Sequence, residues 1–215
     1  MKVLVFDTET SGLPPKYNNN LLETNKWPYI LQIAWILYDT EKNLILDKYV
    51  SFIKVDLNIK IEEKSIEIHK ITHDKLQSKG KYIVDVLNKF NTILKLCDII
   101  IGHNLSFDKN ILLVEAQRNG IVLNFMRDGA QISQYCTMLN SINLCKISFP
   151  NSNNNYKNSY KYPKLSELVY YLFKEENINF HDAIIDVIYT LRCYYRLQKN
   201  LDLFQIDLTF NKLLN

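Results

Sequence analysis

Two long runs rich in apolar residues, joined by a short polar segment, constrain the fold of this chain most strongly. The first run covers Tyr29–Tyr38, the second covers Leu44–Val55, and the polar segment between them is Asp39–Asn43. Runs of this composition predict strands, and five polar residues suit the turn of a β-hairpin. A third apolar run, Val3–Phe6, precedes them. We therefore expect these segments to form an antiparallel start to one sheet.

Helix-like and strand-like segments alternate along the rest of the chain. Apolar residues recur at helical spacing in Tyr82–Leu96, and the β-branched run Ile99–Ile101 that follows is stopped by Gly102. The same patterns predict a last strand and three more helices, at residues 132–136, 107–119, 165–175 and 183–198. This alternation predicts a mixed α/β fold with one sheet.

The composition fits one globular domain that spans residues 1–215. With 47% hydrophobic and 23% charged residues, the chain can bury one substantial core. No apolar run approaches the roughly 20 residues of a membrane span, and the first residues do not resemble a signal peptide. We therefore expect an intracellular protein, cytoplasmic or associated with nucleic acid, that has no membrane partner and is not secreted.

Three further features of the sequence are less specific. The four cysteines show no CxxC pairing, which favours reduced thiols over zinc ligands or disulfides. The segment Asn151–Tyr162 is rich in Asn, Ser, Tyr and Lys and has no periodicity, so we expect a flexible loop inside the domain. The net charge of +3 permits a nucleic-acid partner but does not indicate one.

Two carboxylates follow the first predicted strand. If that strand continues, Asp7 and Glu9 share one face about 6.6 Å apart, where two like charges repel by on the order of 2 kcal/mol at an effective dielectric constant near 20. The alternative is that the strand ends at Phe6 and both acids lie in a solvated turn before Gly12 and Pro14. This stretch alone leaves both interpretations open.

Two more acids occupy unusual places in predicted helices. Asp108 shares a helix face with Ile111 and Leu112, which should pack on the sheet, although an acid early in a helix also suits the helix dipole. Asp186 is the only ionisable group apart from a tyrosine in residues 183–191, which are apolar on nearly every side. A buried acid needs a cation or a raised pKa.

A divalent metal site explains all four acids together. Carboxylates suit Mg²⁺ or Mn²⁺, and a cluster that is unstable through its own repulsion becomes a strong site once ions neutralise it. His181 lies five residues before Asp186, at or just before a helix start, where the helix dipole favours a neutral imidazole that can take a proton from water. We interpret Asp182 as an acid that complements the same dipole.

Three motifs, FDTETSGL, IIGHNLSFDKNIL and HDAIIDV, stand in this order along the chain. Together they resemble the three exonuclease motifs of the DEDDh (DnaQ-like) 3′→5′ exonuclease superfamily, which includes polymerase proofreading subunits, ribonuclease T and oligoribonuclease. Connecting segments such as IHKITHDKL also look like those of the family. The resemblance implies a ribonuclease H-like α/β fold, with a mixed sheet of about five strands, the first three antiparallel, flanked by helices.

The resemblance also implies a function. It is the metal-dependent removal of nucleoside 5′-monophosphates from the 3′ end of single-stranded DNA or RNA, with two Mg²⁺ or Mn²⁺ ions as cofactors. Asp7 then matches the ligand that bridges both ions, and Glu9 and Asp186 match ligands of the ion that holds the attacking water. Asp108 matches the ligand of the second ion, and His181 matches the general base. The residues expected around the terminal nucleotide are Thr8, Thr10, Leu13, His103, Asn104 and Phe107. For Leu13 and Phe107 a packing role stays open.

A catalytically inert nucleic-acid-binding or scaffold domain with the same fold is the alternative hypothesis. Such a domain has little reason to keep all five catalytic positions together. An endonuclease of the wider ribonuclease H-like group is disfavoured by the position of the histidine. The expected partner is nucleic acid with a free 3′ end. The sequence leaves open the choice of DNA or RNA, a homodimer, and association with a polymerase.

Overall fold

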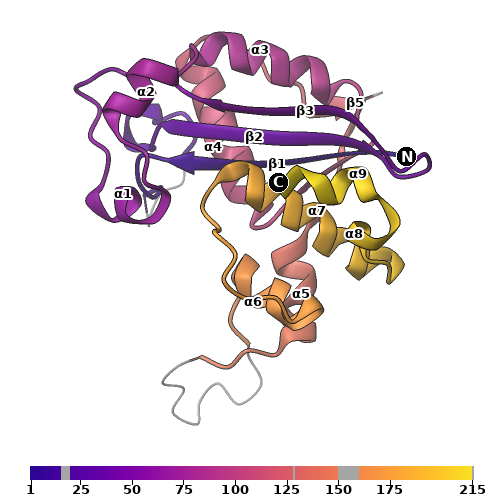
Figure 1. Cartoon of the computed structure of the whole chain (residues 1–215). Coiled ribbons are helices and arrows are strands. Elements are labelled where there is room, and N and C mark those ends of the chain that lie inside the picture. Colours follow the sequence, from indigo (N-terminus) through magenta and orange to yellow (C-terminus); the bar gives the residue numbers. More distant parts are fainter. Residues whose placement is uncertain (16–19, 128, 150–159, 215) are drawn as a thin grey trace.

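The computed structural model of the chain describes residues 1–15, 20–127, 129–149 and 160–214 (Figure 1). The expected loop Asn151–Tyr162 therefore lies outside the described residues, except for its last three positions. All four cysteines lie in the described ranges and are free thiols, as expected. Among the described helices, none is both long and apolar enough to cross a bilayer.

A five-stranded mixed sheet forms the centre of the fold. Its strand order is β3-β2-β1-β4-β7, and a separate two-stranded sheet pairs β5 with β6. The first three strands are antiparallel, whereas β4 and β7 run parallel to β1, so the expectation of an antiparallel start is confirmed. The strands are β1 (Lys2–Thr10), β2 (Ile30–Asp39), β3 (Leu44–Phe52), β4 (Ile99–Gly102), β5 (Met126–Arg127), β6 (Ala130–Gln131) and β7 (Ser133–Cys136).

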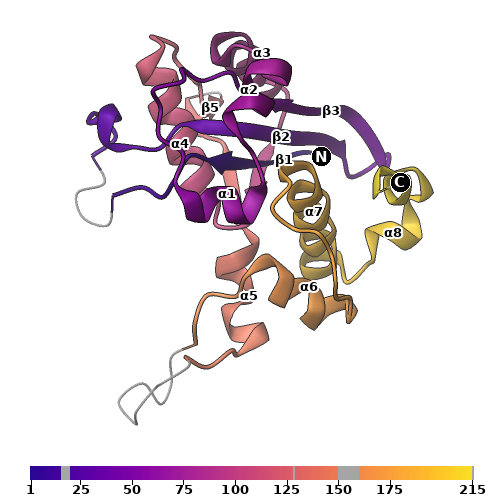
Figure 2. The same ribbon diagram turned by 60° about the vertical axis from the view of Figure 1, so that its left-hand side comes forward.

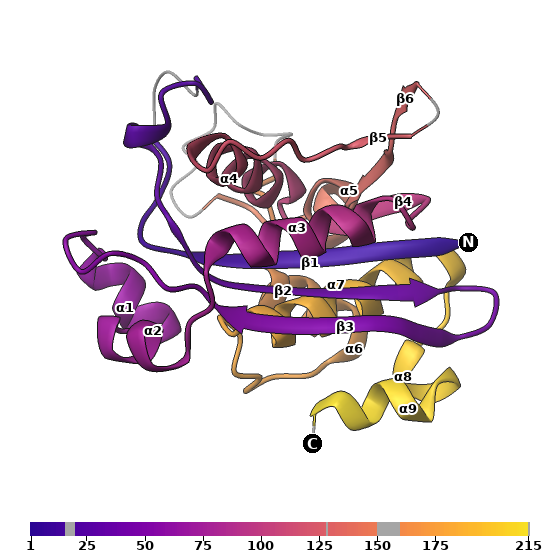
Figure 3. The same ribbon diagram turned by 90° about the horizontal axis from the view of Figure 1, so that it is seen from above.

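Helices cover both faces of the sheet (Figure 3). Successive residues of β1 point to opposite faces of the sheet. Leu4 and Phe6 belong to the core that the sheet forms with α3 (Ile83–Leu94) and α4 (Leu105–Arg118). Val3 and Val5 belong to the core on the opposite face, with α7 (Ala183–Lys199). Since side chains alternate along a strand, Asp7 and Glu9 continue the face that packs on α7.

The smaller elements lie around this central unit. The short helices α5 and α6 lie below the sheet beside α7 (Figures 1 and 2). Helices α8 and α9 follow α7, and Asp207 between them accepts a hydrogen bond from Tyr38 Oη of β2 at 2.8 Å. Their bounds, with those of the other short helices, are η1 (Thr24–Lys26), α1 (Glu63–His69), α2 (His73–Lys79), α5 (Thr137–Cys145), α6 (Leu165–Phe173), α8 (Leu203–Ile206), α9 (Leu208–Asn211) and η3 (Lys212–Leu214).

The strand that carries the first two acids is longer than its apolar run. β1 continues from Phe6 through Thr10, paired with β2 throughout, so the alternative of a strand that ends at Phe6 is wrong. On its other side, β1 pairs with β4 only over Val3–Val5. The second half of β1 therefore has strand neighbours on one side alone.

Candidate active site

Asp108 of α4 lies beside the second half of β1, on the side where β1 has no strand neighbour. Asp108 lies in the first turn of α4 and is 2% exposed, which confirms the predicted burial. Its Oδ1 atom accepts hydrogen bonds from the backbone N of Thr8 at 2.9 Å and from Thr8 Oγ1 at 2.7 Å. The backbone N–H of Thr8 lies beyond the end of β4, so it donates to a carboxylate instead of to a neighbouring strand.

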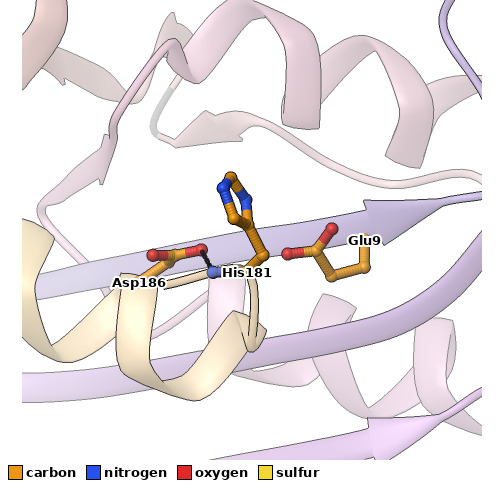
Figure 4. Close-up of side chains that lie close together, drawn as sticks. All are labelled: Glu9, His181 and Asp186. Atoms are coloured by element: carbon orange, nitrogen blue, oxygen red, sulfur yellow. Dashed lines mark hydrogen bonds between the residues drawn. The ribbon is translucent and has the colours of Figure 1, made fainter. Parts of the chain in front are cut away.

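The start of α7 brings an acid and a histidine to Glu9 (Figure 4). Single ligand atoms of Glu9, His181 and Asp186 all lie within 4.8 Å of one another. His181 adopts a left-handed backbone conformation with a φ of +72°, and its N–H donates to Asp186 Oδ2 at 3.1 Å. The other oxygen of Asp186 is buried and has no hydrogen-bond partner among the described residues. A buried, unpartnered carboxylate oxygen is what a cation ligand looks like before its ion binds.

A glutamine from β2 fixes where α7 begins. Gln32 Nε2 donates to Asp182 Oδ1 at 3.1 Å, and its Oε1 accepts from the backbone N of Ala183 at 3.3 Å. Asp182 itself is the N-cap of α7 and accepts from Ile184 N. This capping role agrees with the interpretation of Asp182 as a helix-start acid, and it ties His181 to the sheet through its neighbour.

The four acids are held in an environment that opposes their ionisation. Burial is the main cause in each case, and repulsion from neighbouring acids adds to it, which for Asp186 is the charge of Asp182. The pKa of Glu9 is raised to about 8 and those of Asp108 and Asp186 to about 7, while the pKa of Asp7 lies well above its usual value. The two Thr8 hydrogen bonds partly offset this effect at Asp108. Bound divalent cations would remove the repulsion, so the donor set fits Mg²⁺ or Mn²⁺.

Five of the six expected substrate residues lie near the ends of the elements that carry the acids. Thr8 and Thr10 lie on β1 and are buried, and Thr10 Oγ1 donates to the carbonyl of Gly12 at 2.7 Å. Leu13 follows β1 and is 74% exposed, which is more than a packing residue would show. The other two belong to the start of α4, namely the N-cap Asn104 and the half-buried Phe107. Contact of all five with a nucleotide stays a prediction.

His103, the sixth, is engaged within the protein. Its Nε2 lies 3.0 Å from the carbonyl oxygen of Pro163, and its Nδ1 lies 2.9 Å from Thr137 Oγ1. Since a carbonyl only accepts, Nε2 carries the proton of the neutral ring. Burial lowers the pKa of His103 to about 4. These contacts give His103 a role in joining β4 to α5 and to the segment before α6, and its predicted contact with substrate remains untested.

Sequence reasoning assigned no role to His69, which the fold brings to the end of β1. This buried residue ends α1, and its Nε2 lies 3.2 Å from the carbonyl oxygen of Thr10. Its Nδ1 accepts from the backbone N of Ile71 at 3.0 Å, so Nε2 is the donor to Thr10. The only sequence signal was its place in the family-like segment IHKITHDKL.

Comparisons with known proteins identify a family and a shared fold. The family model RNase_T: Exonuclease matches residues 4–194. No curated protein sequence gives a significant match. A structure of exonuclease I is 21% identical, with a TM-score of 0.69 over 97% of this chain and 43% of that chain. Exonuclease I from Methylocaldum szegediense is 19% identical, with a TM-score of 0.67 over 95% of this chain and 42% of that one.

A third structure adds a bound nucleic acid. The zinc-bound complex of E. coli exonuclease I with single-stranded DNA is 21% identical, with a TM-score of 0.68 over 97% of this chain and 43% of that chain. This chain therefore spans less than half the length of the exonuclease I structures that it resembles. At such identity these structures establish a shared fold, an α/β unit with a five-stranded mixed sheet flanked by helices.

Proposed function

The chain belongs to the RNase_T exonuclease family, and we propose from this premise that residues 1–215 form one 3′→5′ exonuclease domain. It would hydrolyse single-stranded nucleic acid from the 3′ end and release nucleoside 5′-monophosphates. The observation that carries this proposal is the meeting of Glu9, His181 and Asp186 within 4.8 Å at the end of β1. A complex of E. coli exonuclease I, which shares the fold, contains single-stranded DNA, and this supports the choice of substrate.

Four carboxylates would hold the metal ions: Asp7, Glu9, Asp108 and Asp186. The unpartnered, buried Oδ1 of Asp186 and the raised pKa values of all four acids support this assignment. Two bound Mg²⁺ or Mn²⁺ ions would activate the attacking water and stabilise the leaving 3′ oxygen. Rigid support comes from β1, which fixes Asp7 and Glu9 two residues apart on one face.

His181 is the proposed general base. Its side chain is exposed, so substrate and water can reach it. Partial desolvation, and to a smaller extent the positive charge of Lys164, lower the pKa of His181 below its usual value. The ring is therefore neutral near pH 7 and can accept a proton from water. The hydrogen bond from its backbone to Asp186 holds the base beside the proposed ligand.

Hydrolysis of 5′-labelled oligonucleotides tests this function. The protein with Mg²⁺ or Mn²⁺ should shorten single-stranded DNA or RNA progressively from the 3′ end, and EDTA should stop the reaction. Asp7→Asn should abolish shortening, whereas the matched variant Asp74→Asn, which changes an exposed acid of α2, should retain it. Binding of oligonucleotides without shortening of any of them would instead support the inert-domain hypothesis.

A further inference from the structure

A hollow of about 410 Å³ lies beside the end of β1, outside the carboxylate cluster. Three segments form its wall: residues 11–13 after β1, residues 25–29 before β2, and residues 58–60 with Glu62 before α1. This volume lies in the range of small-molecule binding sites and is large enough for one nucleotide. Leu13, the exposed residue after β1, is part of the wall.

Ser11 ties the three segments together and places the hollow next to the active site. Its N–H donates to the carbonyl of Tyr29 at 2.9 Å, and its Oγ accepts from the N–H of Tyr29 at 2.9 Å. Its carbonyl accepts from the N–H of Glu62 at 2.8 Å. Ser11 follows Glu9 by two residues, which is about 7 Å along an extended chain. A nucleic-acid strand that ends at the carboxylates is therefore within reach of this hollow over its last nucleotides.

The wall offers groups that suit a nucleotide. Lys60 is exposed, and Lys26 forms an ion pair with Glu23 at 2.9 Å. The amide of Asn58 adds hydrogen-bonding groups. Tyr29 is half-buried, and the guanidinium carbon of Arg118 lies 3.9 Å from the centroid of its ring, so a base can stack on the other face alone. Lysine ammonium groups bind phosphates as point charges. The wall therefore combines a phosphate-binding charge with groups that accept any base.

One acid in the wall works against a phosphate. Glu62 lies over Gly12, where an added Cβ atom would approach Glu62 Oε1 to 2.6 Å. The absence of a side chain at Gly12 thus lets this carboxylate lie against the backbone at the edge of the hollow. Its negative charge should weaken the attraction of the wall for a polyanion.

We propose that this hollow is a second nucleotide subsite, which binds the substrate strand on the 5′ side of the scissile bond through Lys60. The inference rests on the proposed exonuclease function and deepens it. Lys60 neutralises a backbone phosphate, and Tyr29 and Asn58 contact the nucleotide beside it. The subsite lowers the KM for oligonucleotides and takes no part in the chemical step.

Two substrates distinguish the contribution of this subsite from that of the catalytic centre. One is a single-stranded oligonucleotide, and the other is the p-nitrophenyl ester of thymidine 5′-monophosphate, which has a terminal nucleotide and no nucleotide on its 5′ side. Lys60→Gln should raise the KM for the oligonucleotide about fivefold and reduce its salt dependence, because one phosphate contact is lost. It should leave ester hydrolysis unchanged, and Lys60→Arg should restore the oligonucleotide KM.

Two further variants complete the test. Glu62→Gln should lower the KM for the oligonucleotide, because it removes a repulsive charge. Lys42→Gln is the matched control, because Lys42 lies in the turn between β2 and β3 at the opposite end of the sheet (Figure 3). It should change neither the KM for the oligonucleotide nor the hydrolysis of the ester. An unchanged oligonucleotide KM in Lys60→Gln, or an equal loss on both substrates, would overturn the subsite.

If the proposed exonuclease function is wrong, the outcome differs from that of a wrong subsite. In that case the wild-type protein hydrolyses neither substrate. Binding of the oligonucleotide then tests the hollow directly: weaker binding by Lys60→Gln than by Lys42→Gln supports it, and equal affinities overturn it. Thermal unfolding of each variant shows whether the fold is retained.

Discussion

Thr8 and Asp108 lie 100 residues apart in the sequence and share two hydrogen bonds, both to the same carboxylate oxygen. The backbone bond depends only on the path of β1, whereas the hydroxyl bond depends on the side chain of Thr8. Asp108, the metal ligand proposed on α4, is thus oriented by the strand that carries Asp7 and Glu9. Removing a hydrogen-bond partner that orients a metal ligand typically lowers metal affinity or activity by roughly 10–100-fold.

Thr8→Val removes the hydroxyl bond and keeps the shape and the backbone bond. We expect the Mg²⁺ concentration needed for half-maximal activity to rise by roughly 10-fold or more. Thr8→Ser keeps a hydroxyl donor and should stay close to the wild type. The measurement is a Mg²⁺ titration of oligonucleotide hydrolysis. An identical titration for Thr8→Val and wild type would contradict a role for this bond.

Asp7→Asn should change activity and stability in opposite directions. The buried, negatively charged surroundings raise the pKa of Asp7, so its charge destabilises the metal-free fold near neutral pH. The amide removes that charge, and the melting temperature in EDTA should rise by a few degrees. Oligonucleotide hydrolysis should fall by more than about 100-fold, because the ligand proposed to bridge the two ions is lost. A loss of both stability and activity would indicate simple misfolding.

The metal-free protein should lose stability as the pH rises. The pKa of Glu9 increases from 4.5 in the unfolded chain to about 8 in the fold, so between these values the folded protein binds more protons than the unfolded one. Stability is therefore highest below pH 4.5 as far as this group is concerned and decreases toward pH 8. Thermal unfolding in EDTA across this range should show the decrease, and millimolar Mg²⁺ or Mn²⁺ should reduce it.

His103 should contribute stability with the opposite pH dependence. Its pKa falls from 6.5 in the unfolded chain to about 4 in the fold, so its contribution is complete above pH 6.5 and is lost as the pH falls toward 4. His103→Phe removes the hydrogen bonds to Thr137 and Pro163 and should cost about 1–2 kcal/mol at pH 7. Urea unfolding at pH 7 and pH 5 measures this, and the variant should lose less stability than the wild type between the two.

The sequence predicted the sheet and the large helices because their apolar patterns are long. The hairpin, β4, α3 and α7 lie within a few residues of the expected ranges, and the predicted burial of Asp108 and Asp186 is confirmed. The order and spacing of the three motifs predicted a shared site, and in the fold Glu9, His181 and Asp186 lie within 4.8 Å of one another. The start of α4 lies two residues before the expected one, since Asn104 takes a left-handed conformation that no apolar pattern marks.

Other features of the fold could not be predicted from the pattern of apolar residues. The helices α1 and α2 have seven residues each, and each buries a single side chain, so neither has a clear apolar stripe. The left-handed backbone of His181 is unusual for a residue other than glycine and depends on contacts made after folding. The hollow beside Ser11 joins three segments that are distant in sequence, and only the folded chain shows that they meet.

Because β4 ends early, the backbone N–H of Thr8 can bind either a longer β4, which would stabilise the sheet, or Asp108, which the proposed site needs. β4 pairs with β1 only as far as Val5, and the Thr8 N–H beyond it is taken by Asp108. A chain whose fourth strand ran a few residues further would gain sheet hydrogen bonds and would displace this carboxylate. Under the proposed function, a longer β4 would stabilise the sheet and reduce hydrolysis, so insertions at Gly102 should be among the least tolerated in the protein.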